Sequence, residues 1–201
     1  MSARLVLASG NPGKLREFRR LLEPLDFDVI AQAELGIRDA EEPFPTFIEN
    51  ALAKARHACD KSGLPALADD SGICVDALGG APGVRSARYA GEPLSDARNN
   101  EALVAALAGI GNRRAHYYCV LVLMKHAADP HPLIAEGIWH GSVVDTPRGH
   151  DGFGYDPHFE DLATGLTGAE LPLARKNELS HRGHAMRGLI ARIRDEQRHG
   201  T

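Results

Sequence analysis

The stretch RLVLASGNPGK, residues 4–14, decides the fold, because an apolar strand runs there directly into a turn and the start of a helix. Asn11 suits the position before a helix, and Pro12 suits the first helical position. The residues that follow carry apolar side chains at helical spacing, namely Leu15, Phe18, Leu21, Leu22 and Leu25. The segment therefore predicts a strand followed by a helix.

Strands and helices alternate along the rest of the chain. The apolar runs predict strands over 29–31, 66–68, 73–75, 116–125 and 133–139. Helices are predicted from the capping box of Thr46 and Glu49, over 95–107, and from Ser180 onward. This alternation is typical of an α/β protein. Because no linker interrupts the pattern, we expect one domain over residues 1–201.

Composition excludes several classes of protein. The 201 residues carry 23 basic and 27 acidic side chains, so the net charge is −4, unlike that of a protein that relies on phosphate-backbone attraction. The longest apolar run, residues 117–124, is far shorter than the roughly 20 residues of a membrane span. The three cysteines lack metal-ligand spacing and read as buried thiols of a reducing compartment. We expect a cytoplasmic protein.

The turn SGNPGK, residues 9–14, is a candidate phosphate site. Backbone N–H groups at a helix N-terminus, with Lys14 beside them, favour an anion, and Gly10 and Gly13 allow its close approach. The spacing is not that of a Walker A loop. The alternative is a capped helix start with a surface lysine, and the spacing alone leaves both open.

Acidic residues form the second candidate. Asp69 and Asp70 follow an apolar strand, where ligands of α/β proteins bind and where carboxylates can hold Mg²⁺. Glu41 and Glu42, in an earlier loop, offer a further carboxylate for the same ion. The alternatives are an Asp-containing turn and a solvated acidic pair.

Two later segments could bind an organic ligand. In GFGYDP, residues 152–157, glycines flank Phe153, whose ring could stack on a nucleobase. Lys176 and the SHRG segment, residues 180–183, bring hydrogen-bond donors near a helix start. The alternatives are a turn with packed aromatic rings and a basic surface cluster.

The ordered set of motifs resembles the inosine/xanthosine triphosphate pyrophosphatases, a family that acts on non-canonical purine nucleotides. The resemblance runs from residue 4 to about residue 194, through SGNPGK, EE at 41–42, TFIENALAKA at 46–55, ADDSG at 68–72, GGAPG at 79–83, SARYAG at 86–91, GFGYDP and SHRG. It implies a long mixed sheet flanked by helices in two lobes, with the active site in the cleft between them. It also implies a homodimer and Mg²⁺-assisted hydrolysis of ITP, dITP, XTP and dXTP to the monophosphate and pyrophosphate. Neither a nucleic acid nor a membrane is an expected partner.

The resemblance also assigns roles to residues. Asp70 matches the catalytic carboxylate and a Mg²⁺ ligand, Glu42 matches the other metal acid, and Asp69 and Glu41 would support them. The substrate-binding positions are Ser9, Gly10, Asn11, Pro12, Gly13 and Lys14 for the triphosphate, Ser71, and Phe153, Gly154, Tyr155, Asp156, Lys176, His181 and Arg182 for the base. Donors among these suit O6 of hypoxanthine and xanthine and oppose the amino group of adenine.

One departure and two alternatives remain. The family commonly has Gly-Gly before Phe-Gly-Tyr-Asp, whereas here Asp151 precedes Gly152, which could alter the mobility or selectivity of the loop. A pyrophosphatase for modified pyrimidine nucleotides is one alternative, and the purine-type residues around Phe153 argue against it. A catalytically silent nucleotide-binding module is the other, and the paired acids argue against that.

Overall fold

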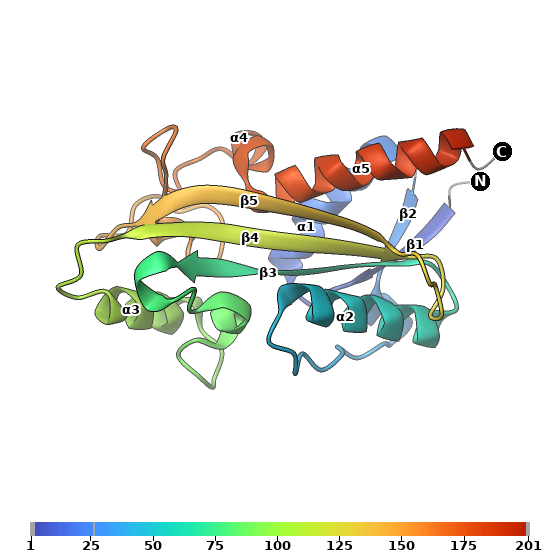
Figure 1. The fold of residues 1–201 in the computed structure, drawn as a ribbon, viewed down its shortest axis with the longest axis horizontal. Coiled ribbons are helices and arrows are strands. Elements are labelled where there is room, and N and C mark those ends of the chain that lie inside the picture. Colours follow the sequence, from blue (N-terminus) through green and yellow to red (C-terminus); the bar gives the residue numbers. More distant parts are fainter. Residues whose placement is uncertain (1–2, 26, 200–201) are drawn as a thin grey trace. The chain divides into compact units, whose positions relative to one another are not determined.

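A mixed sheet forms the centre of the fold. The computed structural model describes residues 3–25 and 27–199, and six strands within them form one sheet in the order β2-β1-β3-β4-β5-β6 (Figure 1). Strand β1 is parallel to both β2 and β3, and β5 is antiparallel to β6. The strands are β1 Ala3–Ala8, β2 Phe27–Ala31, β3 Ala66–Val75, β4 Arg114–Met124, β5 Leu133–Val143 and β6 Phe159–Asp161. The predicted α/β class with a mixed sheet is confirmed.

The described helices are α1 Pro12–Leu22, α2 Phe47–Ser62, α3 Asp96–Ala106, α4 Leu173–Leu179 and α5 His181–His199. The helix starts predicted near residues 12, 47, 96 and 181 are confirmed, since each lies beside a side chain suited to capping. Helix α4 and strand β6 were not predicted, because seven and three residues are too short to show a period. Nowhere in the described part of the chain is a helix long and apolar enough to cross a membrane.

The chain divides into two compact units, each with its own core. Unit 1 comprises Met1–Asp70, Cys119–Gly137 and Gly183–Thr201. Its sheet is covered on one face by α1 and α5 and on the other by α2 (Figure 1). The core on the first face combines apolar side chains of α1, α5 and the strands, among them Leu5, Leu7, Phe18, Leu22, Leu67, Leu121, Met186 and Leu189. Helix α2 instead buries small residues, Ala51, Ala55 and Ala58, which lets it lie close to the strands.

Unit 2 comprises Ser71–Tyr118 and Ile138–Arg182. Its core joins α3 to the sheet and is rich in aromatic rings, with Leu103, Leu107, Tyr117, Trp139, Tyr155 and Phe159 among its members. Strands β3, β4 and β5 each contribute residues to both units. One two-lobed domain over 1–201, with a cleft between the lobes, stays a prediction.

Strand β3 corrects the expected position of the acids. The sequence predicted two short strands with Asp69 and Asp70 in the turn between them, but Ala66–Val75 is one continuous strand. A mid-strand position buries both carboxylates, at 1% and 5% exposure. Such burial is costly unless the charges are paired, and lysine side chains supply that pairing.

Candidate functional site

The SGNPGK turn forms a capped helix start. The side-chain Oδ1 of Asn11 accepts hydrogen bonds from the backbone N–H groups of Gly13, at 2.8 Å, and Lys14, at 3.1 Å. Leu15 N–H donates to the Asn11 carbonyl, and Pro12 has no N–H to offer. Asn11 therefore engages the N–H groups of the first turn, as its predicted place before the helix implies. An anion at this turn would have to replace Asn11 Oδ1 or bind the side chain of Lys14.

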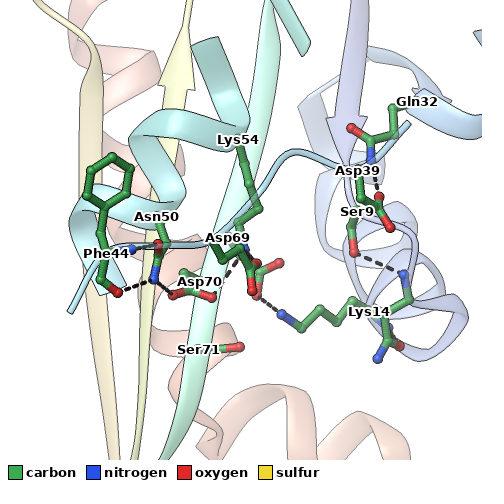
Figure 2. A network of polar contacts seen from close by, with 12 residues as sticks. Ser9, Lys14, Gln32, Asp39, Phe44, Asn50, Lys54, Asp69, Asp70 and Ser71 are labelled. Carbon is green, nitrogen blue, oxygen red and sulfur yellow. Dashed lines mark hydrogen bonds and ion pairs between the residues drawn. The ribbon is translucent and has the colours of Figure 1, made fainter. Parts of the chain in front are cut away.

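Gly10 allows a close approach, but the group beside it is a carboxylate. A side chain at Gly10 would place its Cβ 2.7 Å from Asp39 Oδ2. Gln32, which is buried, donates a hydrogen bond to the other oxygen of Asp39 (Figure 2). Asp39 was not singled out in the sequence, because one acid in a polar loop carries no spacing signal.

Two lysines pair with the acids of β3 (Figure 2). Lys14 Nζ lies 2.9 Å from Asp69 Oδ2. Lys54 Nζ lies 3.1 Å from Asp70 Oδ1 and 2.5 Å from Glu42 Oε1, so one ammonium group bridges two carboxylates. The structure thus brings Lys14, Glu42, Asp69 and Asp70 together, whereas Glu41 is exposed.

Helix α2 supplies two residues that sequence reasoning missed. Lys54 is one of them, and Asn50 lies one turn before it. Asn50 is fully buried and donates to Asp70 Oδ2, at 3.3 Å, and to the Phe44 carbonyl, at 3.1 Å. Its Oδ1 accepts from the Phe44 N–H at 3.0 Å. The available signal was the i, i+4 spacing of two polar residues on an otherwise alanine-rich face, where polar side chains need partners.

Burial and charge act in opposite directions on this cluster. Burial raises the pKa of the Asp70 carboxyl above its ordinary value, and the Lys54 ammonium opposes that rise without cancelling it. Burial lowers the pKa of Lys54, but the carboxylates of Asp70, Asp69 and Glu42 together raise it above its ordinary value. Lys54 is therefore charged at neutral pH, and Asp70 is more basic than an exposed aspartate.

The donor chemistry of this cluster fits a hard cation. Among residues 3–25 and 27–199, no group of three or more His, Cys, Asp and Glu converges as a ready metal site. The carboxylates of Glu42, Asp69 and Asp70 nevertheless provide the oxygen ligands that Mg²⁺ prefers. Three carboxylates face two ammonium groups, which leaves a net negative charge. The acids already bind two lysine ammonium groups, and their net negative charge suits a divalent cation as well.

In unit 2, Asp156 organises the segment that carries Phe153. Asp156 Oδ2 accepts from Lys176 Nζ at 2.6 Å and from the Phe153 N–H at 2.8 Å. A side chain at Gly152 would collide with this carboxylate, so the close approach requires glycine there. Lys176 Nζ also lies 4.8 Å from the centre of the Phe153 ring, which is cation–π distance. Phe153 as a whole is only half-buried.

Of the other predicted base-pocket residues, Arg182 lies near the Phe153 ring, whereas His181 packs on Tyr117. Arg182 donates to Ser71 Oγ at 3.0 Å, and its guanidinium lies 5.8 Å from the Phe153 ring centre. His181 stacks on Tyr117, with ring centroids 4.6 Å apart and planes 8° apart. Lys176 and Arg182 thus lie near the Phe153 ring, and Asp156 holds both Lys176 and the Phe153 backbone.

Tyr155, predicted as a substrate contact, packs in the core of unit 2. It is buried, and its hydroxyl donates to the Ser86 carbonyl at 2.8 Å. Burial also raises the pKa of this hydroxyl. Tyr155 therefore anchors the segment to the core of unit 2. Asp151 is exposed, and its backbone N–H donates to the Ala169 carbonyl, so the loop accepts a side chain at this position.

The fold and the two clusters define an α/β protein with a cluster of acids paired with lysines in one unit and an aromatic, basic cluster in the other. Residues 5–192 match the model of the Ham1 family, and the chain belongs to that family. It is 64% identical over 194 residues to the dITP/XTP pyrophosphatase of Ralstonia nicotianae, covering 95% of this chain and 96% of that protein. It is 61% identical to the dITP/XTP pyrophosphatase of Aromatoleum aromaticum, covering 96% and 98%. The solved structure of a HAM1 protein from Coxiella burnetii has a TM-score of 0.89 at 46% identity, covering 96% of this chain and 99% of that one.

Proposed function

We propose that this chain is a dITP/XTP pyrophosphatase, which hydrolyses non-canonical purine nucleoside triphosphates to the monophosphate and pyrophosphate. The observation that carries the proposal is its likeness, over nearly the full length of both chains, to two proteins of that name. The buried acids beside lysines suit phosphate hydrolysis. The half-buried Phe153, with cationic groups over its ring, suits a purine.

Asp70 is assigned the proton-accepting role. Water is a poor nucleophile at neutral pH, and a carboxylate within reach can take its proton as it attacks the α-phosphorus. The upward pKa shift that burial gives Asp70 makes it a stronger base than an exposed aspartate. Lys14 and Lys54, each paired with an acid in this structure, are assigned to neutralise negative charge on the phosphates of the substrate. Ser9, Gly10, Asn11, Pro12 and Gly13 stay proposed triphosphate contacts.

Mg²⁺ is the proposed cofactor, held by Glu42 and Asp70 with Asp69 in support. When bound, it would supply the positive charge that stabilises the anionic transition state and leaving group. Lys54 bridges Glu42 and Asp70, so its ammonium group would either share these acids with the ion or move from one of them.

The base is assigned to Phe153, Lys176, His181 and Arg182, with Ser71, Gly154 and Asp156 in support. Phe153 offers a ring face for stacking, and Lys176 and Arg182 are donors suited to O6 of the base. A site built on hydrogen bonds can reject a mispaired analogue such as adenine by orders of magnitude. Tyr155 anchors the segment to the core of unit 2 through its buried ring and its hydrogen bond to Ser86.

The direct test is pyrophosphate release from ITP, XTP, GTP, ATP and dUTP, with and without Mg²⁺. We expect fast, metal-dependent release from ITP and XTP and slow release from GTP and ATP. Preference for dUTP would favour the pyrimidine alternative, and release from none of the five would contradict the proposal.

The stacking role has a test of its own. We expect Phe153→Ala to raise KM for ITP and to change kcat little, since stacking stabilises bound substrate and transition state alike. Leu162→Ala, an exposed position in the same unit, is the matched control and should behave as the unsubstituted protein. A fall in kcat alone would contradict the stacking role.

A homodimer and a cytoplasmic location belong to the same proposal, and both rest on the sequence. Sedimentation of the purified protein at micromolar concentration tests the first, with a mass of twice 21.6 kDa expected. A single species of monomer mass would contradict it.

A further inference from the structure

We propose that Asp96 and Asn100, on α3, are positioning residues for the base: they hold the Gly154 peptide and so fix the Phe153 ring. The inference rests on the proposed function, and it extends the base-reading group to a helix that the sequence motifs do not include. All the residues that carry it belong to unit 2.

The first observation is that α3 holds Gly154 at both of its backbone polar groups. The Gly154 N–H donates to Asp96 Oδ2 at 2.7 Å. The Gly154 carbonyl accepts from Asn100 Nδ2 at 2.8 Å. Two side chains one helical turn apart thus bind one residue that lies 54 and 58 positions further along the chain.

The second observation explains why an asparagine stands at position 100. Its Nδ2 also donates to the Asp96 carbonyl at 2.8 Å, so the two amide hydrogens serve two carbonyl oxygens. An aspartate of the same shape would place an acceptor against both carbonyls. Asn100 is 8% exposed, and in the described residues its Oδ1 has no hydrogen-bond partner. Since a buried polar atom without a partner is costly, the donor end of this side chain is what the fold uses.

The third observation ties this contact to the ring. Gly154 directly follows Phe153 and has φ +64°, a conformation in which other residues are strained. On the N-terminal side of Phe153, its backbone N–H donates to Asp156 Oδ2. The backbone is therefore fixed at both ends of Phe153. Asp156 holds its N–H, and the α3 side chains hold Gly154, which follows it. Their loss should let the ring leave its place near Lys176 and Arg182.

The experiment compares two products as inhibitors of ITP hydrolysis, because IMP carries the base and pyrophosphate does not. The disrupting variants are Asp96→Ala and the isosteric Asn100→Asp. Asp96→Asn keeps an acceptor oxygen and should rescue, and Glu101→Gln, on the exposed face of α3, is the matched control. We expect both disrupting variants to raise KM for ITP and the inhibition constant of IMP about tenfold, as loss of one or two hydrogen bonds does. The inhibition constant of pyrophosphate should not change, and kcat should stay within about twofold.

The outcomes are separable. Unchanged IMP inhibition in both disrupting variants would overturn the proposal, and so would equal weakening of IMP and pyrophosphate, which would indicate general loosening of the fold. Thermal unfolding of each variant identifies any that fails to fold, and the other disrupting variant then decides. If the unsubstituted protein releases no pyrophosphate from ITP, the proposed function itself has failed, which is a different result.

Discussion

At the scale of single residues, Asp70 has the most exacting surroundings in unit 1. Its two carboxylate oxygens have different partners, the Lys54 ammonium on one side and the Asn50 amide on the other. The side chain is held in one orientation and largely removed from water. Such an arrangement suits the proposed proton transfer, and the burial of the charge carries an energetic cost that the rest of the fold must offset.

Asp70→Asn should abolish turnover, because the amide cannot accept a proton from water. We expect pyrophosphate release from ITP to fall at least about 100-fold, the usual contribution of a positioned general base. Asp60→Asn, an exposed acid on α2, serves as the control. Near-normal rates in the Asp70 variant would sink the role assigned to this residue.

The same variant should be more stable than the unsubstituted protein at neutral pH. Burial raises the pKa of Asp70 in the folded state, so the ionised carboxylate disfavours folding. The stability that protonated Asp70 contributes is fully present below its unfolded pKa, about 4, and is lost as pH rises through the folded pKa. An asparagine is neutral throughout. The gain in Tm should therefore be absent near pH 4 and largest at pH values above the folded pKa, measured by thermal unfolding across that range. A lower Tm for the variant throughout would mean that pairing with Lys54 outweighs burial.

Much of the site could be predicted at this scale, because the decisive residue types follow one another in the chain. Asp69-Asp70 and Phe153-Gly154-Tyr155-Asp156 mark themselves by composition. Asn50, Lys54, Asp96 and Asn100 could not be found that way. Each is an ordinary helical polar residue, and only the tertiary contact with Asp70 or Gly154 gives it a role.

At the scale of elements, α2 does more than cover the sheet. It begins at the Thr46 cap, as the sequence predicted, and its first two turns bring Asn50 and Lys54 to the acids. Through Asn50 it also fixes the backbone of Phe44, in the loop that carries Glu42. The position of Glu42 therefore depends on a helix that follows it in the chain.

Asn50→Ala should destabilise the protein and weaken its response to Mg²⁺. The change leaves the Phe44 N–H and carbonyl without their amide partner, which costs about 1–3 kcal/mol in unfolding free energy. Because Glu42 then loses its fixed position, the Mg²⁺ concentration for half-maximal rate should rise. Denaturant unfolding and a Mg²⁺ titration measure the two effects, with Ser62→Ala at the far end of α2 as the control. An unchanged Mg²⁺ response would separate Asn50 from the acid group.

Strand β3 shows the limit of prediction for elements. Two adjacent aspartates before Ser-Gly favour a turn on local grounds. The chain instead stays extended from Ala66 to Val75, because Lys14 and Lys54 from two helices pair with the carboxylates. Tertiary pairing outweighs local preference, and a local pattern cannot reveal it.

At the scale of the whole molecule, three strands contribute to both cores. Residues Leu121 of β4 and Leu67 of β3 belong to the core of unit 1, while Tyr117 and Ile73 of the same strands belong to that of unit 2. The α/β class and the helix starts could be predicted from periodicity and caps. The boundaries of the two units could not, since they depend on which distant segments pack together.

We expect the two units to unfold together, because continuous strands join their cores. Leu67→Ala removes a fully buried side chain of unit 1 and should cost about 2–5 kcal/mol. Trp139, the one tryptophan of the chain, lies in unit 2 and reports on that unit alone. Its fluorescence transition should shift as far as the far-ultraviolet circular dichroism transition does. A fluorescence midpoint that stays in place while the dichroism midpoint moves would show independent unfolding.

The interleaving of the two units restricts how such a gene can diversify. Unit 1 is built from three separated stretches and unit 2 from two, and one boundary falls between Asp70 and Ser71. No single recombination crossover can exchange either unit for another while keeping the other one whole. Exchange of either unit as a module would therefore need several crossovers, whereas a point substitution at a position such as Asp151 changes one unit and leaves the chain order intact.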